Sequence, residues 1–301
     1  MYNTFLTDCE ASDIDQQVAK VLRGIGNPEP PLRLEDVREL LELDLKFYSS
    51  NNDGYVRETI SRIKVAGKQI LKRPTILLDA IQKRDLKALW VPDRKRILID
   101  ETLPRLKWRW SEGHEIGHSI IPWHDEMMHG DNKRTLTPSA EQQLEAEANF
   151  AAGRLLFLGD KFKERLLSNP LTYASIDDLA TVFGNTKTTT LWRAVETLEV
   201  PAFGLVTQHP SQPVDQDKPT VRYFVRSKAF KEQFSRVTTQ FLFAQLGPVC
   251  RSGNGPIGRA DVLLTDLNSD QHVFCLEAFH NSYETLTLGT HQRLRKLAVA
   301  V

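Results

Sequence analysis

The sequence has only three cysteines, and this scarcity excludes a fold held together by a framework of disulfide bonds. Cys9, Cys250 and Cys275 are far apart and none belongs to a CxxC pair, so a cysteine-rich zinc site is also excluded. Free thiols of this kind are typical of proteins in the reducing cytosol. We therefore expect a cytoplasmic protein.

The chain also lacks a net charge, a targeting segment and a long apolar run. Lysine and arginine together number 39, as do aspartate and glutamate, so no overall field draws the chain to nucleic acid or to an anionic membrane. The first fifteen residues are polar and acidic, unlike a signal peptide, and no apolar run approaches the roughly 18 residues of a membrane-spanning helix. These absences predict a soluble protein without a membrane partner and argue against direct binding of nucleic acid.

The first part of the chain reads as helices interrupted by a small β-structure. Residues 10–85 indicate several helices separated by turn residues, one of them over 33–47, and alternation then predicts a strand hairpin from 86–91 and 96–101. A helix from about 106 to 120 follows, and a second helix opens at Ser139 with a capping-box pattern and stops at Gly159. Residues 1–168 are therefore expected to form one mainly helical domain.

The pattern changes twice after this domain. Within 169–200, two helical runs flank Gly184 and Asn185, which predicts a helix-turn-helix-like segment. Lys187 and Arg193 of this segment could contact DNA phosphates, but its acidic residues favour a role in packing or partner docking. From 201 to 301, short alternating runs, including FLFAQL at 241–246, predict a β-rich domain of unknown role, so the whole chain is expected to be α+β.

The residues best suited to metal binding and catalysis are His114, Glu115 and His118, which form the pattern H-E-x-x-H on a predicted helix. Residues four apart on a helix share one face, so both imidazoles can reach one metal ion. Glu115 is rotated by about 100° and can hydrogen-bond a metal-bound water, whose pKa zinc lowers to about 7. The pattern predicts a hydrolytic zinc site in which His114 and His118 bind Zn²⁺ and Glu115 is the general base. The helix-weakening Gly113 and Gly117 indicate close packing or room near the metal.

A catalytic zinc ion usually has a third protein ligand, and two residues are candidates. His124 completes a spacing similar to that of the metzincin proteases, but Ile121 stands where their pattern has a glycine. Glu145 lies on the next predicted helix with Asn149 one turn further along, and a carboxylate on an apolar helix side needs a partner such as a metal. A solvated helix face would equally suit Glu145, as it suits Glu147. The spacing alone leaves the third ligand open.

Residues 55–200 resemble the ImmA/IrrE zinc metallopeptidases of bacteria and their mobile elements. The resemblance rests on the strand RILID, Arg109, the motif GHEIGH, the turn PWH and the run EAEANFAAGRLL. The run LATVFGNTKTTTLWRAVETL is similar to the helix-turn-helix-like segment that follows the protease core in this family. The sequence departs from the family pattern at Phe150, which follows Asn149 directly and so arrives one position early.

The resemblance implies a zincin-like core in residues 1–168, with Glu145 as the third zinc ligand and Asn149 as a supporting residue. It also implies a zinc endopeptidase that cleaves a specific intracellular protein, a helix-turn-helix transcriptional repressor, in a stress or mobile-element response. The alternative is a non-catalytic sensing or DNA-binding regulatory protein that retains the metallopeptidase fold. By analogy with other zinc proteases, we expect residues 96–101 to form an edge strand that takes up the substrate as an added strand.

Overall fold

The computed structural model describes residues 6–48, 88–91, 95–124, 138–211, 213, 215–250 and 255–294. The chain divides into two compact units. The N-terminal unit contains residues 6–162 and 182–185, and the C-terminal unit contains residues 163–181 and 186 onward. The chain passes between the units within α8 (Asp160–Leu167) and again within α9 (Tyr173–Phe183). The functional domain limits expected after residues 168 and 200 stay a prediction, and the helices expected between residues 49 and 87 lie outside the described residues.

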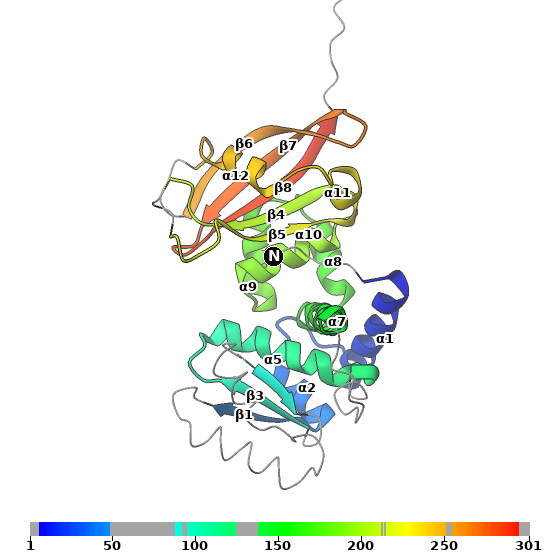
Figure 1. Cartoon of the computed structure of the whole chain (residues 1–301). Helices are drawn as coiled ribbons and strands as arrows, with labels where there is room; N and C mark the ends of the chain where they lie inside the picture. The colour runs from blue at the N-terminus through cyan, green and yellow to red at the C-terminus, as the bar shows by residue number, and fades with distance from the viewer. Residues whose placement is uncertain are drawn as a thin grey trace, which may run out of the picture. The chain divides into compact units, whose positions relative to one another are not determined.

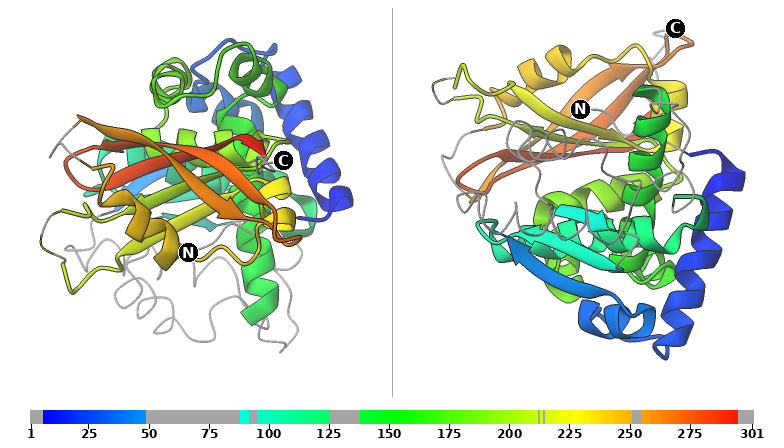
Figure 2. Two further views of the ribbon diagram at one scale, coloured as in Figure 1. Left: turned by 90° about the horizontal axis from the view of Figure 1, so that it is seen from above. Right: turned by 60° about the horizontal axis from the view of Figure 1, so that its bottom comes forward.

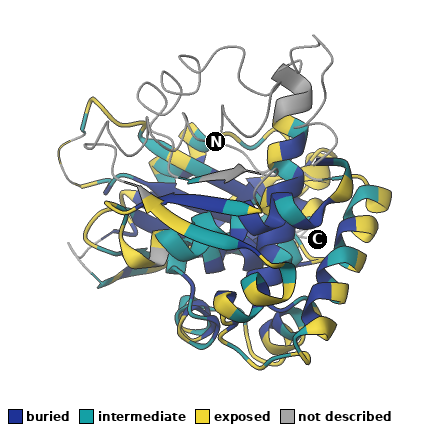
Figure 3. Ribbon diagram, turned by 90° about the horizontal axis from the view of Figure 1, so that it is seen from below, coloured by how far each residue is buried: buried dark blue, intermediate teal, exposed yellow. Residues whose placement is uncertain are grey.

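The N-terminal unit begins with α1 (Asp8–Gly24), whose start the sequence encodes locally. The Thr7 side chain accepts a hydrogen bond from the backbone N–H of Glu10, and the Glu10 carboxylate accepts one from the backbone N–H of Thr7 at 2.8 Å. This capping box satisfies two donors that a helix end would otherwise leave without partners. The buried residues of α1 recur at helical spacing: Ile14, Val18, Val21 and Leu22. Figure 3 shows such helices with exposed residues on one side and buried residues on the other.

The chain after α1 departs from the predicted helix over 33–47, which is wrong in its second half. Helix α2 covers only Leu34–Leu41, because Glu42 takes a left-handed conformation with φ 58° and ends it. The next residues form β1 (Asp44–Tyr48), a strand that pairs in parallel with residues 96–100. Arg96 also forms an ion pair of 2.7 Å with Asp44. Pairing with a distant segment thus overrides the local helical pattern.

A three-stranded sheet forms from β1, β2 (Ala88–Val91) and β3 (Arg96–Asp100), in the order β1-β3-β2. Strands β2 and β3 pair antiparallel, as the sequence predicts. The expectation that residues 96–101 form an edge strand is wrong, because β3 is hydrogen-bonded to a neighbour on both sides. Its central position also explains why Ile97, Leu98 and Ile99 are all buried. A substrate peptide cannot add to β3, and among the described strands β1 and β2 are the outer ones of this sheet.

Two further helices of the N-terminal unit lie where the sequence predicts them: α5 (Arg105–Ile120) and α7 (Pro138–Leu156). Figure 1 shows α5 lying over the three-stranded sheet, with α7 packed on its other side. Glycines permit this contact. A Cβ added at Gly117 would lie 2.7 Å from the Ala148 carbonyl oxygen, and one at Gly113 would lie 2.9 Å from Leu156 Cδ1. Of the two sequence-based explanations for these glycines, close packing is therefore the one that the structure supports.

The C-terminal unit contains an antiparallel five-stranded sheet in the order β5-β4-β8-β7-β6. The strands are β4 (Ala202–Thr207), β5 (Val221–Arg226), β6 (Gly255–Thr265), β7 (Gln271–His280) and β8 (Thr285–Leu294). Figure 2 shows the long strands β6, β7 and β8, coloured orange to red, side by side. The helices of this unit include α10 (Lys187–Thr197), α11 (Lys228–Gln233) and α12 (Thr239–Leu246). The strand predicted over 241–246 is therefore wrong, since these residues belong to α12.

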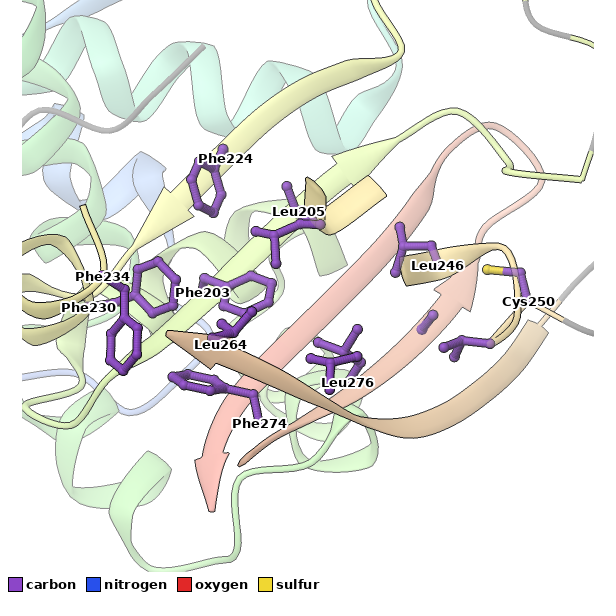
Figure 4. Packing of buried hydrophobic residues seen from close by; sticks show 14 of the residues in the cluster. Phe203, Leu205, Phe224, Phe230, Phe234, Leu246, Cys250, Leu264, Phe274 and Leu276 are labelled. Carbon is purple, nitrogen blue, oxygen red and sulfur yellow. The ribbon is translucent and has the colours of Figure 1, made fainter. Parts of the chain in front are cut away.

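Helix α12 arises because Thr238 caps it, its side chain accepting a hydrogen bond from Phe241 N at 3.2 Å. Leu242 and Leu246, four residues apart, are buried in the core between the sheet and the helices α11 and α12. Figure 4 shows this core around the aromatic rings of Phe203, Phe230 and Phe274. A six-residue apolar run fits a strand or one side of a short helix equally well.

Strand β4 is buried along its whole length because helices cover both sides of the sheet around it. Phe203 and Leu205 point into the core below α11 and α12, whereas a Cβ added at Gly204 would lie 3.2 Å from Leu191 Cγ of α10. The predicted α+β class is confirmed by this sheet together with the helical N-terminal unit. Among the described residues, no helix is both long and apolar enough to cross a membrane.

Candidate metal centre

The structure brings His114, His118 and Glu145 together from α5 and α7. His114 Nε2 lies 3.3 Å from Glu145 Oε2, and His118 Nε2 lies 3.6 Å from Glu145 Oε1. One ligand atom from each residue lies within 4.8 Å of the others, and in the described parts of the chain this is the one such group of three or more donors. Tetrahedral zinc bonds of about 2.0–2.2 Å would place ligand atoms about 3.3 Å apart. The donor set therefore fits a single metal ion.

Each histidine of the cluster has its second ring nitrogen occupied by a different neighbour. Asn149 Oδ1 lies 3.1 Å from His114 Nδ1. Because an amide oxygen only accepts, His114 Nδ1 carries a proton and donates it, so the neutral ring that a metal ion would bind has its lone pair on Nε2. The position of Asn149 one turn after Glu145 on α7 makes this contact possible. Asn149 thus orients His114 in the way that outer neighbours of metal-bound histidines do.

His124, the other candidate for the third ligand, lies behind His118 and away from Glu145. Its Nδ1 is 2.9 Å from His118 Nδ1, and its Nε2 is 2.8 Å from Glu147 Oε2. The His124 side chain is fully buried. Both of its ring nitrogens are therefore already in hydrogen bonds with protein groups. The geometry groups Glu145, and not His124, with the two histidines of the H-E-x-x-H pattern.

Glu147 is the residue whose environment sequence reasoning misses. Its position on α7 suits a solvated face, yet only 4% of the residue is exposed. Its carboxylate accepts hydrogen bonds from Trp123 Nε1 at 2.6 Å, His124 Nε2 at 2.8 Å and Gln143 Nε2 at 3.1 Å. The available signal was the PWH turn, which supplies two of these donors just after α5. A buried carboxylate with three donors is well satisfied.

His114 and Glu145 shift each other's pKa values toward the charged forms. Hydrogen bonds from His114 and His118 hold the pKa of the Glu145 carboxyl well below its usual range. Burial opposes the charged form of His114, but the hydrogen bond to Glu145 and the nearby charge of Glu115 outweigh it and raise the pKa of His114. Glu115 itself is buried, with 7% of the residue exposed. When His114 is protonated, it forms an ion pair with Glu145, with 3.3 Å between Nε2 and Oε2.

We expect zinc binding to this cluster to release a proton and to strengthen as the pH rises. Zinc requires neutral His114, and the raised pKa of His114 lets protons compete at a higher pH than they would at an ordinary histidine. Below that pKa, one competing proton should weaken the apparent affinity about tenfold per pH unit. Calorimetric titration with Zn²⁺ at pH 6 and pH 8, in buffers of different ionisation enthalpy, measures both effects. An affinity that does not change with pH would contradict the assignment of His114.

Arg109, which belongs to the family resemblance, lies away from the three donors and has a packing contact instead. Its Nε lies 3.4 Å from Asn185 Oδ1, and its Nη2 lies 3.4 Å from the Phe183 carbonyl oxygen. Phe183 and Asn185 are in the part of the N-terminal unit that follows α9. Arg109 therefore links α5 to the end of α9.

The helix-turn-helix-like segment consists of α9, a turn with Gly184 at φ 66°, and α10. Lys187 forms an ion pair of 2.6 Å with Asp177 and lies 4.4 Å from the centre of the Phe279 ring. Arg193 of α10 is buried. Both basic residues that could contact DNA phosphates are thus placed within the C-terminal unit.

Comparisons with known proteins give a structural match and no sequence match. No protein-family model matches the chain, and no curated protein matches it by sequence. A solved structure described as "Mycobacterium tuberculosis transcriptional regulator" is similar over 93% of this chain and 88% of its own, with a TM-score of 0.52 and 12% sequence identity. At this identity the similarity shows a shared fold alone.

Proposed function

We propose that this chain is a zinc-dependent endopeptidase of the ImmA/IrrE type. The observation that carries the proposal is the grouping of His114, His118 and Glu145 on two packed helices, with the carboxylate of Glu115 next to His114 on α5. These three donors and the adjacent acid are the groups that a hydrolytic zinc site requires. The donors come from residues 31 positions apart in sequence (114 to 145), so their convergence is a property of the fold and not of the motif alone.

His114, His118 and Glu145 would hold the zinc ion. When bound, the ion would act as a Lewis acid and would lower the pKa of the water molecule bound to it. Glu115 then accepts the proton of the attacking water and passes it to the leaving amine. Asn149 fixes the ring of His114 through its amide oxygen, so that Nε2 keeps its lone pair toward the site. In the sheet, β3 is paired on both sides, so of the described strands only β1 and β2 could take up an extended substrate.

The substrate that we propose is a specific intracellular protein, a helix-turn-helix transcriptional repressor. The resemblance of residues 55–200 to regulatory proteases supports this class of substrate. The second candidate is a non-catalytic sensing or DNA-binding regulator, and the description of the structural neighbour as a transcriptional regulator is consistent with it. The ion pair of Lys187 and the burial of Arg193 count against reading of DNA by these two side chains.

Co-expression with the helix-turn-helix repressor encoded nearest to the gene tests the proposal. We expect the repressor to be cut at one position, identified by mass spectrometry, and we expect a chelator to stop cleavage and added Zn²⁺ to restore it. A gel-shift assay with the operator of that repressor tests the second candidate. If the zinc-loaded chain leaves the repressor intact and slows the operator DNA in the gel, the protease proposal is wrong and the DNA-binding regulator is supported.

A further inference from the structure

A buried chain of hydrogen bonds runs from Glu147 through His124 to His118. The carboxylate and both rings are almost inaccessible, with exposed fractions of 4%, 0% and 8% in that order. The distances along the chain are 2.8 Å from Glu147 Oε2 to His124 Nε2 and 2.9 Å from His124 Nδ1 to His118 Nδ1. Trp123 Nε1 donates a second hydrogen bond to the same Glu147 oxygen and helps to hold the carboxylate in place. All four residues lie in the N-terminal unit.

The direction of these hydrogen bonds follows from the first acceptor. The Glu147 carboxylate only accepts, so His124 Nε2 carries a proton and donates it. His124 Nδ1 is then free to accept a hydrogen bond from His118 Nδ1–H. With its proton on Nδ1, the neutral His118 ring that a metal ion would bind has its lone pair on Nε2, the atom that lies 3.6 Å from Glu145 Oε1. The carboxylate of Glu147 thus sets the tautomer of a residue that it does not touch.

We propose that Glu147 and His124 form a positioning pair that holds the ring and the tautomer of His118 for metal binding. The inference rests on the proposed metal site and deepens it. His114 is oriented by the neutral amide of Asn149, whereas His118 is backed by a carboxylate through a second ring. A carboxylate behind a histidine makes its metal-binding nitrogen a stronger donor. His118 is therefore the stronger of the two imidazole donors.

A purely structural role would not require this arrangement. Taking a carboxylate out of water is costly, and apolar residues of similar volume often stabilise a fold as well as a buried polar pair does. Glu147 is nevertheless buried with three donors, one of which contacts a residue of the candidate metal cluster through its other nitrogen. The fold thus surrounds a buried charge with donors at the one place where that charge can act on His118.

Three variants and one control separate positioning from packing. His124→Phe keeps an aromatic ring but removes both hydrogen bonds, and His124→Asn restores an amide oxygen that can accept from His118 Nδ1–H. Glu147→Gln keeps the shape and removes the charge. Glu39→Gln, at an exposed position of the same unit, is the matched control. Each purified chain is titrated with Zn²⁺ against a chelator of known affinity, and its visible absorption is recorded after loading with Co²⁺.

We expect His124→Phe to weaken zinc binding by about 10- to 100-fold and to shift the Co²⁺ absorption bands. His124→Asn should recover most of the affinity, Glu147→Gln should lose less than His124→Phe, and Glu39→Gln should match the unmodified chain. A His124→Phe chain with unchanged affinity and an unchanged Co²⁺ spectrum would overturn the inference. If His124→Phe does not fold, Glu147→Gln serves as the test. An unchanged zinc affinity and an unchanged Co²⁺ spectrum of the Glu147→Gln chain would overturn the inference.

Nitrogen-15 NMR of the zinc-loaded unmodified chain gives a test that needs no variant. We expect the ring proton on Nδ1 of His118 and on Nε2 of His124, and the opposite assignment for His124 would overturn the inference. None of these readouts uses peptide cleavage. A chain that binds zinc as expected but cuts nothing would therefore refute the proposed peptidase and leave the positioning pair in place, whereas a chain that binds no metal would refute both.

Discussion

Glu115→Gln should abolish peptide cleavage while zinc stays bound with its normal affinity. Glutamine has nearly the same shape, so the buried site beside His114 stays filled, but an amide cannot accept the proton of the attacking water. Loss of a general base of this kind lowers the rate by about 10²- to 10⁴-fold. The measurement is kcat/KM for cleavage of the repressor, together with the zinc content of the same protein sample.

Glu112→Gln is the matched control for this prediction. Glu112 lies on the same helix, one turn before Glu115, and pairs with Arg38 at 2.6 Å rather than with the metal cluster. Removing its charge should leave the cleavage rate within a few-fold of normal. Normal cleavage by zinc-loaded Glu115→Gln would show that Glu115 is not the base. A Glu115→Gln chain that has lost its zinc would instead place Glu115 among the groups that hold the metal.

The parts of the site that the sequence predicts are those that local geometry determines. His114 and His118 are four residues apart on one helix, so their common face follows from helix periodicity alone. Glu145 is on another helix, and its approach to the histidines depends on how closely α5 and α7 pack. Spacing therefore left Glu145 and His124 as alternatives, and the resemblance to a family was needed to prefer Glu145.

The misplaced elements share a different cause, which is contact with residues far away in sequence. Strand β1 forms against β3, with Asp44 opposite Arg96, and no short window contains both partners. Glu147 is buried because Trp123 and His124 reach it from the end of α5. Tertiary partners of this kind decide both the strand that replaces a predicted helix and the burial of a carboxylate on a helix face.

Gly117→Ala should destabilise the N-terminal unit and weaken metal binding at the same time. Alanine raises helix propensity by about 1 kcal/mol relative to glycine, which alone would stabilise α5. The new methyl group would lie 2.7 Å from the Ala148 carbonyl oxygen, a backbone atom that can move only if α7 moves. Overpacking of this kind costs about 1–3 kcal/mol, so after the gain in helix propensity we expect a net loss of up to about 2 kcal/mol in the free energy of unfolding. Urea unfolding of the metal-free chain measures it.

The effect on the metal site follows from the same displacement. Ala148 lies between Glu145 and Asn149 in sequence, so any shift of α7 away from α5 carries both residues away from the two histidines. We expect zinc affinity to fall together with stability. Gly113→Ala is the control, because the nearest atoms to its methyl group belong to the Leu156 side chain and not to the backbone of α7. If both alanine variants were equally stable and bound zinc equally well, the close approach at Gly117 would not be what holds the site together.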